Sequence, residues 1–193
     1  KGACIMNDTI RVIFNDNTTK EYKKGINYYE ISKDFNNKII GVKVNNEIVA
    51  MDKLANNNDK IEFFDASDIN GYKMNQSGLK FVLEVALKET FGANFEVIYD
   101  HSIARGLHMT INSPYPFRKD DTDKLKQAMQ KLIDENTKIE HLNVSKKELM
   151  TYYEKTNNKE KALNIHNVTN NLVSVYRLKN YINYFYTEMP YST

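Results

Sequence analysis

The sequence has 193 residues, a length that suits one medium-sized domain or two small ones. Its single cysteine, Cys4, excludes an internal disulfide and a cysteine-rich zinc site, and no apolar run approaches the roughly 18 residues of a membrane-spanning helix. The formal net charge of +2, with lysines dispersed along the chain, argues against strong non-specific nucleic-acid binding, which needs clustered cations. We therefore expect a cytoplasmic protein without a membrane partner.

The first 66 residues have the pattern of a small domain with short strands around one helix. Asn27 is placed to cap that helix, and Glu30, three residues later, would complete a capping box. The order hairpin, helix, hairpin and strand is that of a β-grasp fold, and an irregular α+β domain of the same size is the alternative. The expected strands are residues 9–14, 18–22, 39–44, 47–50 and 61–64.

A second domain is expected over residues 72–193. The polar segment 65–75 separates it from the first, and an apolar helical pattern follows that ends at Gly92. Ser145 and Glu148 form a capping box before a later helix. The other expected elements are strands at 95–99, 106–111, 139–144, 172–178 and 181–186 and a helix at 121–135.

The first part resembles a TGS domain, the ubiquitin-like module found in threonyl-tRNA synthetases, some GTPases and stringent-response enzymes. Three stretches carry this resemblance: residues 40–49 (Ile-Gly-Val-Lys-Val-Asn-Asn-Glu-Ile-Val), residues 51–54 (Met-Asp-Lys-Leu) and residues 58–62 (Asn-Asp-Lys-Ile-Glu). The resemblance implies a β-grasp domain over residues 1–66.

The second part resembles the editing-type second additional domain of threonyl- and alanyl-tRNA synthetases. Residues 173–178 (Val-Ser-Val-Tyr-Arg-Leu), the glycine-centred stretch 103–108 and the ending 189–193 (Met-Pro-Tyr-Ser-Thr) carry this resemblance. It implies an α+β domain with an antiparallel sheet and flanking helices. Because Thr193 falls inside the family's Pro-Ser-Thr-Gly-like segment, we expect this domain to be truncated at its C-terminal end.

The positions that match the family's metal ligands hold other residues. Gln76 and Lys80 stand where the family has two histidines four apart, and Tyr184 and Glu188 stand where it has cysteine and histidine. A zinc site needs three or four convergent nitrogen, sulfur or oxygen ligands. We therefore expect no catalytic residue, no metal and no cofactor in this chain.

A TGS domain joined to an editing-like domain that lacks the metal-binding side chains looks most like the N-terminal region of bacterial uridine kinase-like nucleoside kinases. This resemblance implies a kinase domain after Thr193, with ATP and Mg²⁺ as its cofactors, because the chain itself has no Gly-x-x-x-x-Gly-Lys-Ser/Thr loop. The kinase domain would then be the chain's partner, and the chain would be its non-catalytic regulatory or ligand-binding region. We expect that role first.

Two other functions remain open. One is a threonyl-tRNA synthetase-type tRNA-binding or editing domain, and the other is an interaction module that docks on protein or RNA. For the kinase-associated role and for the tRNA-binding role, a remnant pocket is the candidate site, and a nucleotide or RNA would be its ligand. The alternative, which we favour, is a Lys–Glu pair that fills an inactive cleft. The candidate pocket residues are Gln76, Lys80, Arg105, Tyr184 and Glu188.

Two further groups of side chains have simpler explanations. His101 and His108 would face opposite sides of one continuous strand, so we interpret them as ordinary strand or loop histidines rather than metal ligands. Aromatic residues gather near the last hairpin, where packing is favoured over stacking on bases. These are Tyr176, Tyr181, Tyr184, Phe185 and Tyr186.

Overall fold

The computed structural model describes residues 8–35, 38–103, 106–156 and 158–193. The chain divides into two compact units, which we describe separately. The first contains residues 1–78 and 186–191, and the second contains residues 79–185 and 192–193. Both combine helices with sheets, which confirms the predicted α+β class. The domain limits 1–66 and 72–193 stay predictions.

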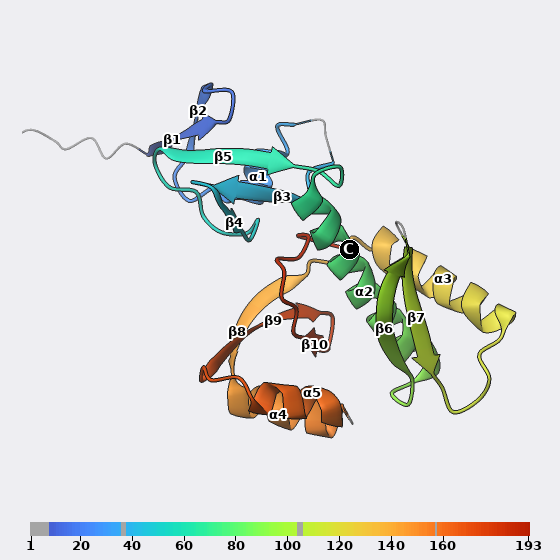
Figure 1. The fold of residues 1–193 in the computed structure, drawn as a ribbon. Coiled ribbons are helices and arrows are strands. Elements are labelled where there is room, and N and C mark those ends of the chain that lie inside the picture. Colours follow the sequence, from blue (N-terminus) through green and yellow to red (C-terminus); the bar gives the residue numbers. More distant parts are fainter. Residues whose placement is uncertain (1–7, 36–37, 104–105, 157) are drawn as a thin grey trace, which may run out of the picture. The chain divides into compact units, whose positions relative to one another are not determined.

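The first unit is built around a five-stranded mixed sheet (Figure 1). The sheet order is β2-β1-β5-β3-β4, and β1 and β5 pair in parallel while the other neighbours are antiparallel. This is the β-grasp arrangement that the sequence predicts. Its elements are β1 (Thr9–Phe14), β2 (Thr19–Lys23), α1 (Tyr28–Ser32), β3 (Gly41–Val44), β4 (Glu47–Val49) and β5 (Asp59–Phe64).

Helix α1 starts at the predicted cap but without the reciprocal bond. The side chain of Asn27 accepts from the backbone nitrogen of Glu30 at 2.8 Å. Both carboxylate oxygens of Glu30 instead accept from the ammonium of Lys33, at 2.7 and 2.8 Å. An ion pair one helical turn away has therefore replaced the predicted capping box. The inner face of α1 packs Tyr28 and Ile31 into the core of the first unit.

One buried carboxylate, that of Asp59 at the start of β5, ties several segments of this unit together. Asp59 is 7% exposed, and its Oδ2 accepts from the hydroxyl of Tyr28 at 2.6 Å and from the backbone nitrogen of Asn56 at 2.7 Å. Its Oδ1 accepts from the side-chain amide of Asn45 at 3.1 Å. Burial raises the pKa of Tyr28, and the hydrogen bond to the carboxylate adds to this, so the phenol remains the proton donor.

Residues 186–191 complete the first unit from the other end of the chain. The ring of Tyr191 stacks on that of Tyr29, with centroids 3.7 Å apart and planes 11° apart. Tyr191 also packs against the hydrophobic core of this unit. On the Tyr29 side, the ammonium of Lys33 lies 4.8 Å from the ring centroid, a cation–π contact.

Helix α2 (Ile69–Phe91) begins earlier than the polar segment 65–75 suggests. Asp68 starts it: its Oδ1 accepts from the backbone nitrogen of Asn70 at 2.7 Å, and its carbonyl accepts from that of Tyr72 at 2.8 Å. Gly71 fits because a Cβ there would lie 1.9 Å from the carbonyl oxygen of Asp65. The polar composition of this segment therefore reflects a helix start and a close packing contact rather than a linker.

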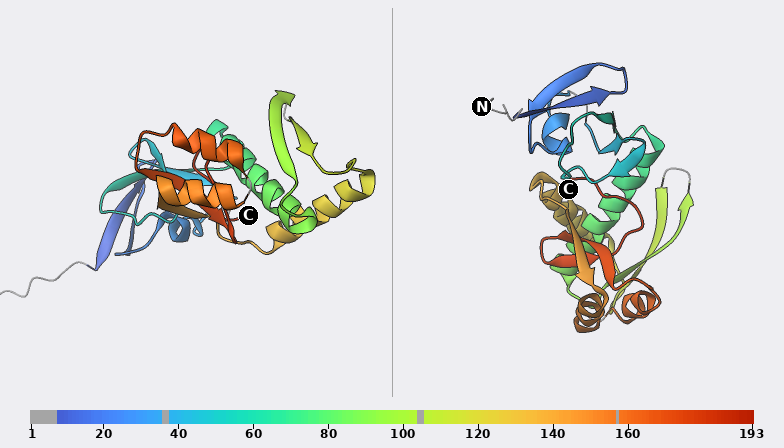
Figure 2. Two further views of the ribbon diagram at one scale, coloured as in Figure 1. Left: turned by 90° about the horizontal axis from the view of Figure 1, so that it is seen from below. Right: turned by 90° about the vertical axis from the view of Figure 1, so that its left-hand side faces the viewer.

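The second unit contains a three-stranded antiparallel sheet, a separate hairpin and several helices (Figure 2). The sheet order is β10-β9-β8, and β6 pairs with β7 in the hairpin. Beside the later part of α2, the elements are β6 (Glu96–Ile103), β7 (Gly106–Asn112), α3 (Lys119–Asp134), β8 (Glu140–Ser145), α4 (Lys146–Lys155), α5 (Lys159–His166), β9 (Leu172–Leu178) and β10 (Tyr181–Asn183). The predicted antiparallel sheet with flanking helices is confirmed.

Helices α4 and α5 pack together on this sheet (Figure 1). The predicted capping box of α4 is present, since the Ser145 hydroxyl accepts from the Glu148 backbone at 3.2 Å and the Glu148 carboxylate accepts from the Ser145 backbone at 3.1 Å. The apolar faces of both helices meet the inner face of the sheet. The buried core there consists of Leu149, Tyr153, Ala162, Ile165, Val173 and Val175.

The aromatic residues of the last hairpin divide into packed and exposed ones. Tyr176 is 5% exposed and stacks on His141, with centroids 5.0 Å apart, and Phe185 packs against Phe81. For these two, the packing role is confirmed. Tyr186 is 93% exposed, so the prediction that it packs is wrong. No helix among the described residues is long and apolar enough to cross a membrane.

Replacing Tyr28 with phenylalanine tests the Asp59 cluster. Tyr28→Phe should lower the free energy of unfolding by about 2 kcal/mol, because it removes a hydrogen bond to a buried carboxylate. Tyr22→Phe is the matched control: it removes a 2.8 Å bond to the exposed Asp34 and should change stability by less than about 0.5 kcal/mol. Urea unfolding measures both, and equal losses would contradict this account.

Candidate functional site

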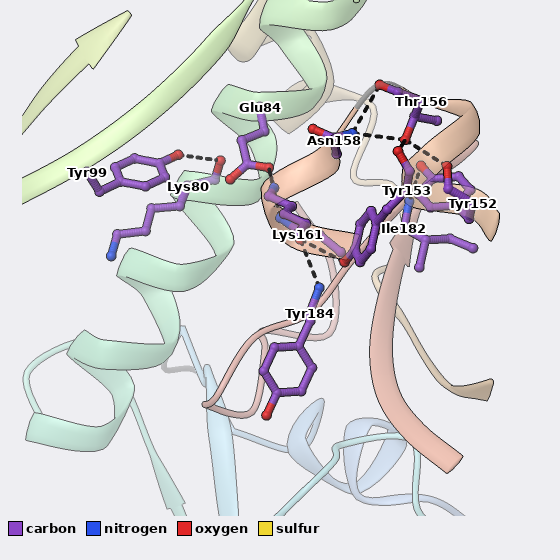
Figure 3. A network of polar contacts seen from close by, with 11 residues as sticks. Lys80, Glu84, Tyr99, Tyr152, Tyr153, Thr156, Asn158, Lys161, Ile182 and Tyr184 are labelled. Atoms are coloured by element: carbon purple, nitrogen blue, oxygen red, sulfur yellow. Dashed lines mark hydrogen bonds and ion pairs between the residues drawn. The ribbon is translucent and has the colours of Figure 1, made fainter. Parts of the chain in front are cut away.

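The second unit contains a polar network centred on Glu84 (Figure 3). Glu84 lies on α2 with a side chain only 15% exposed. Its Oε2 accepts from the ammonium of Lys161 on α5 at 3.0 Å and from the side-chain amide of Asn183 on β10 at 2.8 Å. A single carboxylate oxygen thus joins three elements that are far apart in the sequence.

Asn183 is held in one orientation by two further bonds. Its Oδ1 accepts from the hydroxyl of Tyr153 at 3.3 Å and from the backbone nitrogen of Tyr184 at 2.9 Å. The amide nitrogen must therefore point toward Glu84. Tyr153 is 1% exposed, and burial raises the pKa of its phenol, so it stays a neutral donor.

The end of α4 supports this network from outside. The hydroxyl of Tyr152 accepts from the backbone nitrogen of Ile182 at 2.9 Å, which anchors β10 next to Asn183. The side-chain amide of Asn158 donates to the hydroxyl of Thr156 at 2.9 Å and to its carbonyl at 3.2 Å. These bonds fix the ends of α4 and α5 around the central carboxylate (Figure 3).

A second lysine, Lys88, lies one turn after Glu84 on α2. It is half-buried, and its ammonium lies 6.0 Å from the ring centroid of Tyr181. Burial lowers the pKa of Lys88, and the cation of Lys161 lowers it further, while Glu84 and Glu96 act in the opposite direction. The ion pairs found among the described residues do not include Lys88.

Two small recesses share this group of side chains. Both are lined by Glu84, Lys88, Asn158 and Lys161. In one recess the ammonium groups of Lys88 and Lys161 face the single carboxylate of Glu84, an excess of one positive charge, whereas in the other Glu96 balances this charge. The Asn158 amide adds polar lining to both. The recesses measure only about 20 and 10 Å³, room for about one water molecule each. A small anionic group such as a phosphate or carboxylate would therefore contact the ammonium groups at the surface rather than enter a pocket.

A larger open groove of about 540 Å³ follows the start of α4. Its Lys146 ammonium donates to the carbonyls of His166 and Val168, at 2.6 and 2.8 Å. This lysine therefore fixes the end of α5 to the start of α4, which is a structural role. The Glu84 network is the stronger candidate because its polar groups converge from several elements.

Lys80 of α2 lies next to Tyr99, which belongs to β6. The hydroxyl of Tyr99 donates to the carbonyl oxygen of Lys80 at 3.1 Å, and the Lys80 ammonium lies 5.0 Å from the Tyr99 ring centroid. Burial raises the pKa of Tyr99. The cation is thus placed over an aromatic face (Figure 3).

The structure does not describe the five predicted pocket residues as one site. Gln76 belongs to the first unit, where its amide donates to the Tyr72 hydroxyl at 2.7 Å, and Glu188 belongs to the same unit. Lys80 and Tyr184 belong to the second unit, and Arg105 lies outside the described residues. The pocket and the Lys–Glu pair within it stay predictions.

Sequence reasoning missed the residues of the Glu84 network. Glu84 sits in an almost unbroken apolar run, with Leu83 and Val85 both buried. A lone carboxylate inside a buried helical face is a usable signal, because such a group needs a partner. The partners Lys161 and Asn183 carry no comparable signal, since Lys161 follows a polar segment without clear periodicity.

The interpretation of His101 and His108 as facing opposite sides is wrong. They lie on the two arms of the hairpin, His101 on β6 and His108 on β7. Their rings stack with centroids 5.0 Å apart and planes 18° apart. The error came from treating the segment as one continuous strand, whereas the chain reverses direction between them. Within the described ranges, no group of three or more His, Cys, Asp or Glu side chains could hold a metal.

The comparisons with known proteins point to one kind of enzyme. The chain is 26% identical over 145 residues to the threonine–tRNA ligase of Caldanaerobacter subterraneus subsp. tengcongensis, 22% over 178 residues to that of Ehrlichia canis, and 26% over 171 residues to that of Thermotoga petrophila. These matches cover 73%, 90% and 87% of this chain but only 22%, 28% and 26% of the ligases. No family model matches the chain.

The chain therefore spans about a quarter of the length of the curated relatives it matches. Its similarity is to the N-terminal region of these ligases, and the α+β fold described above is consistent with it. The part of the predicted resemblance that concerns threonyl-tRNA synthetases is thus supported. The three relatives named above are all threonine–tRNA ligases, so they do not support the predicted resemblance to a nucleoside kinase.

Replacing Glu84 with alanine tests the network. Glu84→Ala should lower the free energy of unfolding by about 2–3 kcal/mol, since it leaves Lys161 and Asn183 without their shared acceptor. Glu89→Ala is the matched control on the same helix: its carboxylate lies 3.7 Å from the Lys179 ammonium at the surface, and the loss should stay below about 1 kcal/mol. Chemical denaturation of both variants would show a similar loss if the network contributed nothing.

Proposed function

We propose that the chain is a tRNA-binding region of the type found in threonine–tRNA ligases, and that it acts by binding rather than by metal-dependent hydrolysis. The similarity to these ligases over 73–90% of the chain is the observation that carries the proposal. The absence of histidine and cysteine at Gln76, Lys80, Tyr184 and Glu188 supports binding as the role, because zinc-activated water needs such ligands.

The Glu84 network is the part of the second unit that would receive the RNA. Lys88 supplies a cation that forms no ion pair within the described residues, although the carboxylates of Glu84 and Glu96 act to raise its pKa. The Lys161 ammonium is held in place by Glu84. Phosphate oxygens form charge-assisted hydrogen bonds with such groups, and each lysine contributes to affinity through counterion release. Because this group contains only two lysines, we expect weak to moderate affinity with a shallow dependence on salt.

A second candidate is the non-catalytic region of a uridine kinase-like protein, with a nucleotide as the ligand of the remnant pocket. The observation that favours it is the identity of the four residues at the ligand positions, which lack every expected histidine and cysteine. In that case the partner is a kinase domain with its own ATP and Mg²⁺. This candidate rests on those four positions and the domain order alone.

Binding measurements separate the two candidates. Fluorescence anisotropy with an end-labelled tRNA should show saturable binding that unlabelled tRNA displaces, whereas uridine and ATP should not displace it at millimolar concentration. Lys88→Met should weaken tRNA binding about fivefold, consistent with the loss of one phosphate contact. Lys126→Met, at an exposed position of α3, is the matched control and should leave affinity within about twofold.

The outcomes are distinct. Equal weakening by Lys88→Met and Lys126→Met would mean that the chain binds RNA without using the Glu84 network. Binding of uridine or ATP in preference to tRNA would favour the kinase-type role and overturn the first proposal. Saturable tRNA binding together with release of amino acid from a mischarged tRNA would show that the chain hydrolyses the ester, contrary to the proposal.

Lys88→Met should also stabilise the protein slightly at neutral pH. The folded-state pKa of Lys88 is lowered from 10.5, mainly by burial, so folding disfavours its charged form. Below the folded-state pKa the full penalty applies, and stability recovers as pH rises toward 10.5. Thermal unfolding at pH 7 and pH 10.5 should therefore show a higher Tm for Lys88→Met at pH 7 and a smaller difference at pH 10.5. A lower Tm at pH 7 would contradict this assignment.

A further inference from the structure

The hairpin formed by β6 and β7 contains a bulge that brings three polar side chains together. Tyr99 pairs with Met109 and Ser102 pairs with Leu107, so two residues of β6, Asp100 and His101, lie opposite the single residue His108 of β7. A bulge of this kind breaks the strict alternation of faces along a strand. Neighbouring side chains that would normally diverge can then approach the same partner.

The carboxylate of Asp100 fixes the ring of His108. Its Oδ2 lies 2.9 Å from Nδ1 of His108 and accepts from the hydroxyl of Thr110 at 3.2 Å. Since an ionised carboxylate only accepts, Nδ1 must carry the proton. The neutral ring therefore has its lone pair on Nε2. This is the tautomer and orientation that a carboxylate imposes on a histidine that binds a metal ion.

The second imidazole lies within reach of the first. The rings of His101 and His108 are nearly parallel, with centroids 5.0 Å apart, and both side chains are exposed. A metal–nitrogen bond is about 2.1 Å long, so two nitrogens that share one ion lie at most about 4 Å apart. The 5.0 Å separates the ring centroids, and the nearly parallel rings direct their lone pairs past each other, so the exposed His101 ring must turn about its side-chain torsions for both nitrogens to face one ion.

We propose that His101 and His108 form a two-imidazole binding site for a borderline divalent cation such as Zn²⁺ or Ni²⁺, with Asp100 as the residue that orients His108. Imidazole nitrogen is a preferred ligand of these ions. Because no group of three ligand side chains exists among the described residues, water or a ligand oxygen completes the coordination. The negative charge of Asp100 offsets part of the charge of the bound ion.

This site is independent of the proposed tRNA binding through the Glu84 network. It differs also from the four positions where the editing-type family has its ligands, since none of Gln76, Lys80, Tyr184 and Glu188 takes part. The sequence prediction that the chain holds no metal concerned those positions, together with the mistaken view that the two histidines face apart. The hairpin and its bulge together remove the second reason.

Isothermal titration of the chelator-treated chain with Zn²⁺ or with Ni²⁺, in separate runs, tests the site. One ion per chain is expected. His101→Asn and His108→Asn should each abolish saturable binding at micromolar concentration, because one imidazole alone binds weakly. Asp100→Asn should weaken binding about tenfold through the loss of orientation and charge. His141→Asn, at the histidine that stacks on Tyr176, is the matched control and should bind like the parent chain.

Circular dichroism verifies that each variant is folded, which is expected because His101, His108 and Asp100 are exposed. No saturable binding by the parent chain of either ion would overturn the proposal. An equal loss in His141→Asn would do the same, since it would place the ion elsewhere or on several histidines. Unchanged affinity in Asp100→Asn would remove the orienting role and leave the two histidines as the site.

Discussion

A carboxylate taken out of water has to find hydrogen-bond donors, and the second unit is organised by this requirement at Glu84. Its neighbours on α2 are buried apolar residues, so the helix cannot pack without also burying Glu84. Lys161 and Asn183 satisfy the carboxylate from α5 and β10. Glu84 therefore helps to position those two elements relative to α2, beside the apolar core that holds α5 and the pairing of β10 with β9. The candidate anion-binding group is a consequence of this arrangement.

The first unit uses the same chemistry for a different purpose. Asp59 receives hydrogen bonds from a tyrosine hydroxyl, a backbone nitrogen and an asparagine amide. All three donors are neutral, and they come from α1 and from the turns around β3 and β5. A buried anion with neutral donors holds segments together but offers no cation to a ligand. The contrast explains why the Glu84 network, which includes lysines, is the better candidate for recognition.

Most of the fold could be predicted from the sequence because alternation, helical spacing and caps are local signals. The β-grasp order, the antiparallel sheet and the Ser145–Glu148 capping box are confirmed by the structure. The start of α2 was missed because polar residues around Asp68 resemble a linker while they cap a helix. Local patterns do not distinguish these two uses of the same residue types.

The candidate sites could be predicted far less well, since they depend on contacts between distant segments. Glu84 and Lys161 are 77 residues apart, and nothing in the sequence near either one indicates the other. His101 and His108 come together because β6 and β7 are antiparallel arms of a hairpin, and one extra residue in β6 also shifts the face assignments along that strand. The alternation of polar and apolar side chains in a sequence does not reveal a shift of one residue in the pairing of two strands.

The first unit is assembled from two stretches of chain separated by more than a hundred residues, and this has a consequence for biosynthesis. The ribosome releases a chain from its N-terminus, so residues 1–78 emerge well before residues 186–191. The ring of Tyr29 on α1 therefore has no stacking partner in the nascent unit until Tyr191 is made. Completion of the first unit is thus coupled to synthesis of the second, and a stall in between would leave an aromatic surface open to chaperones.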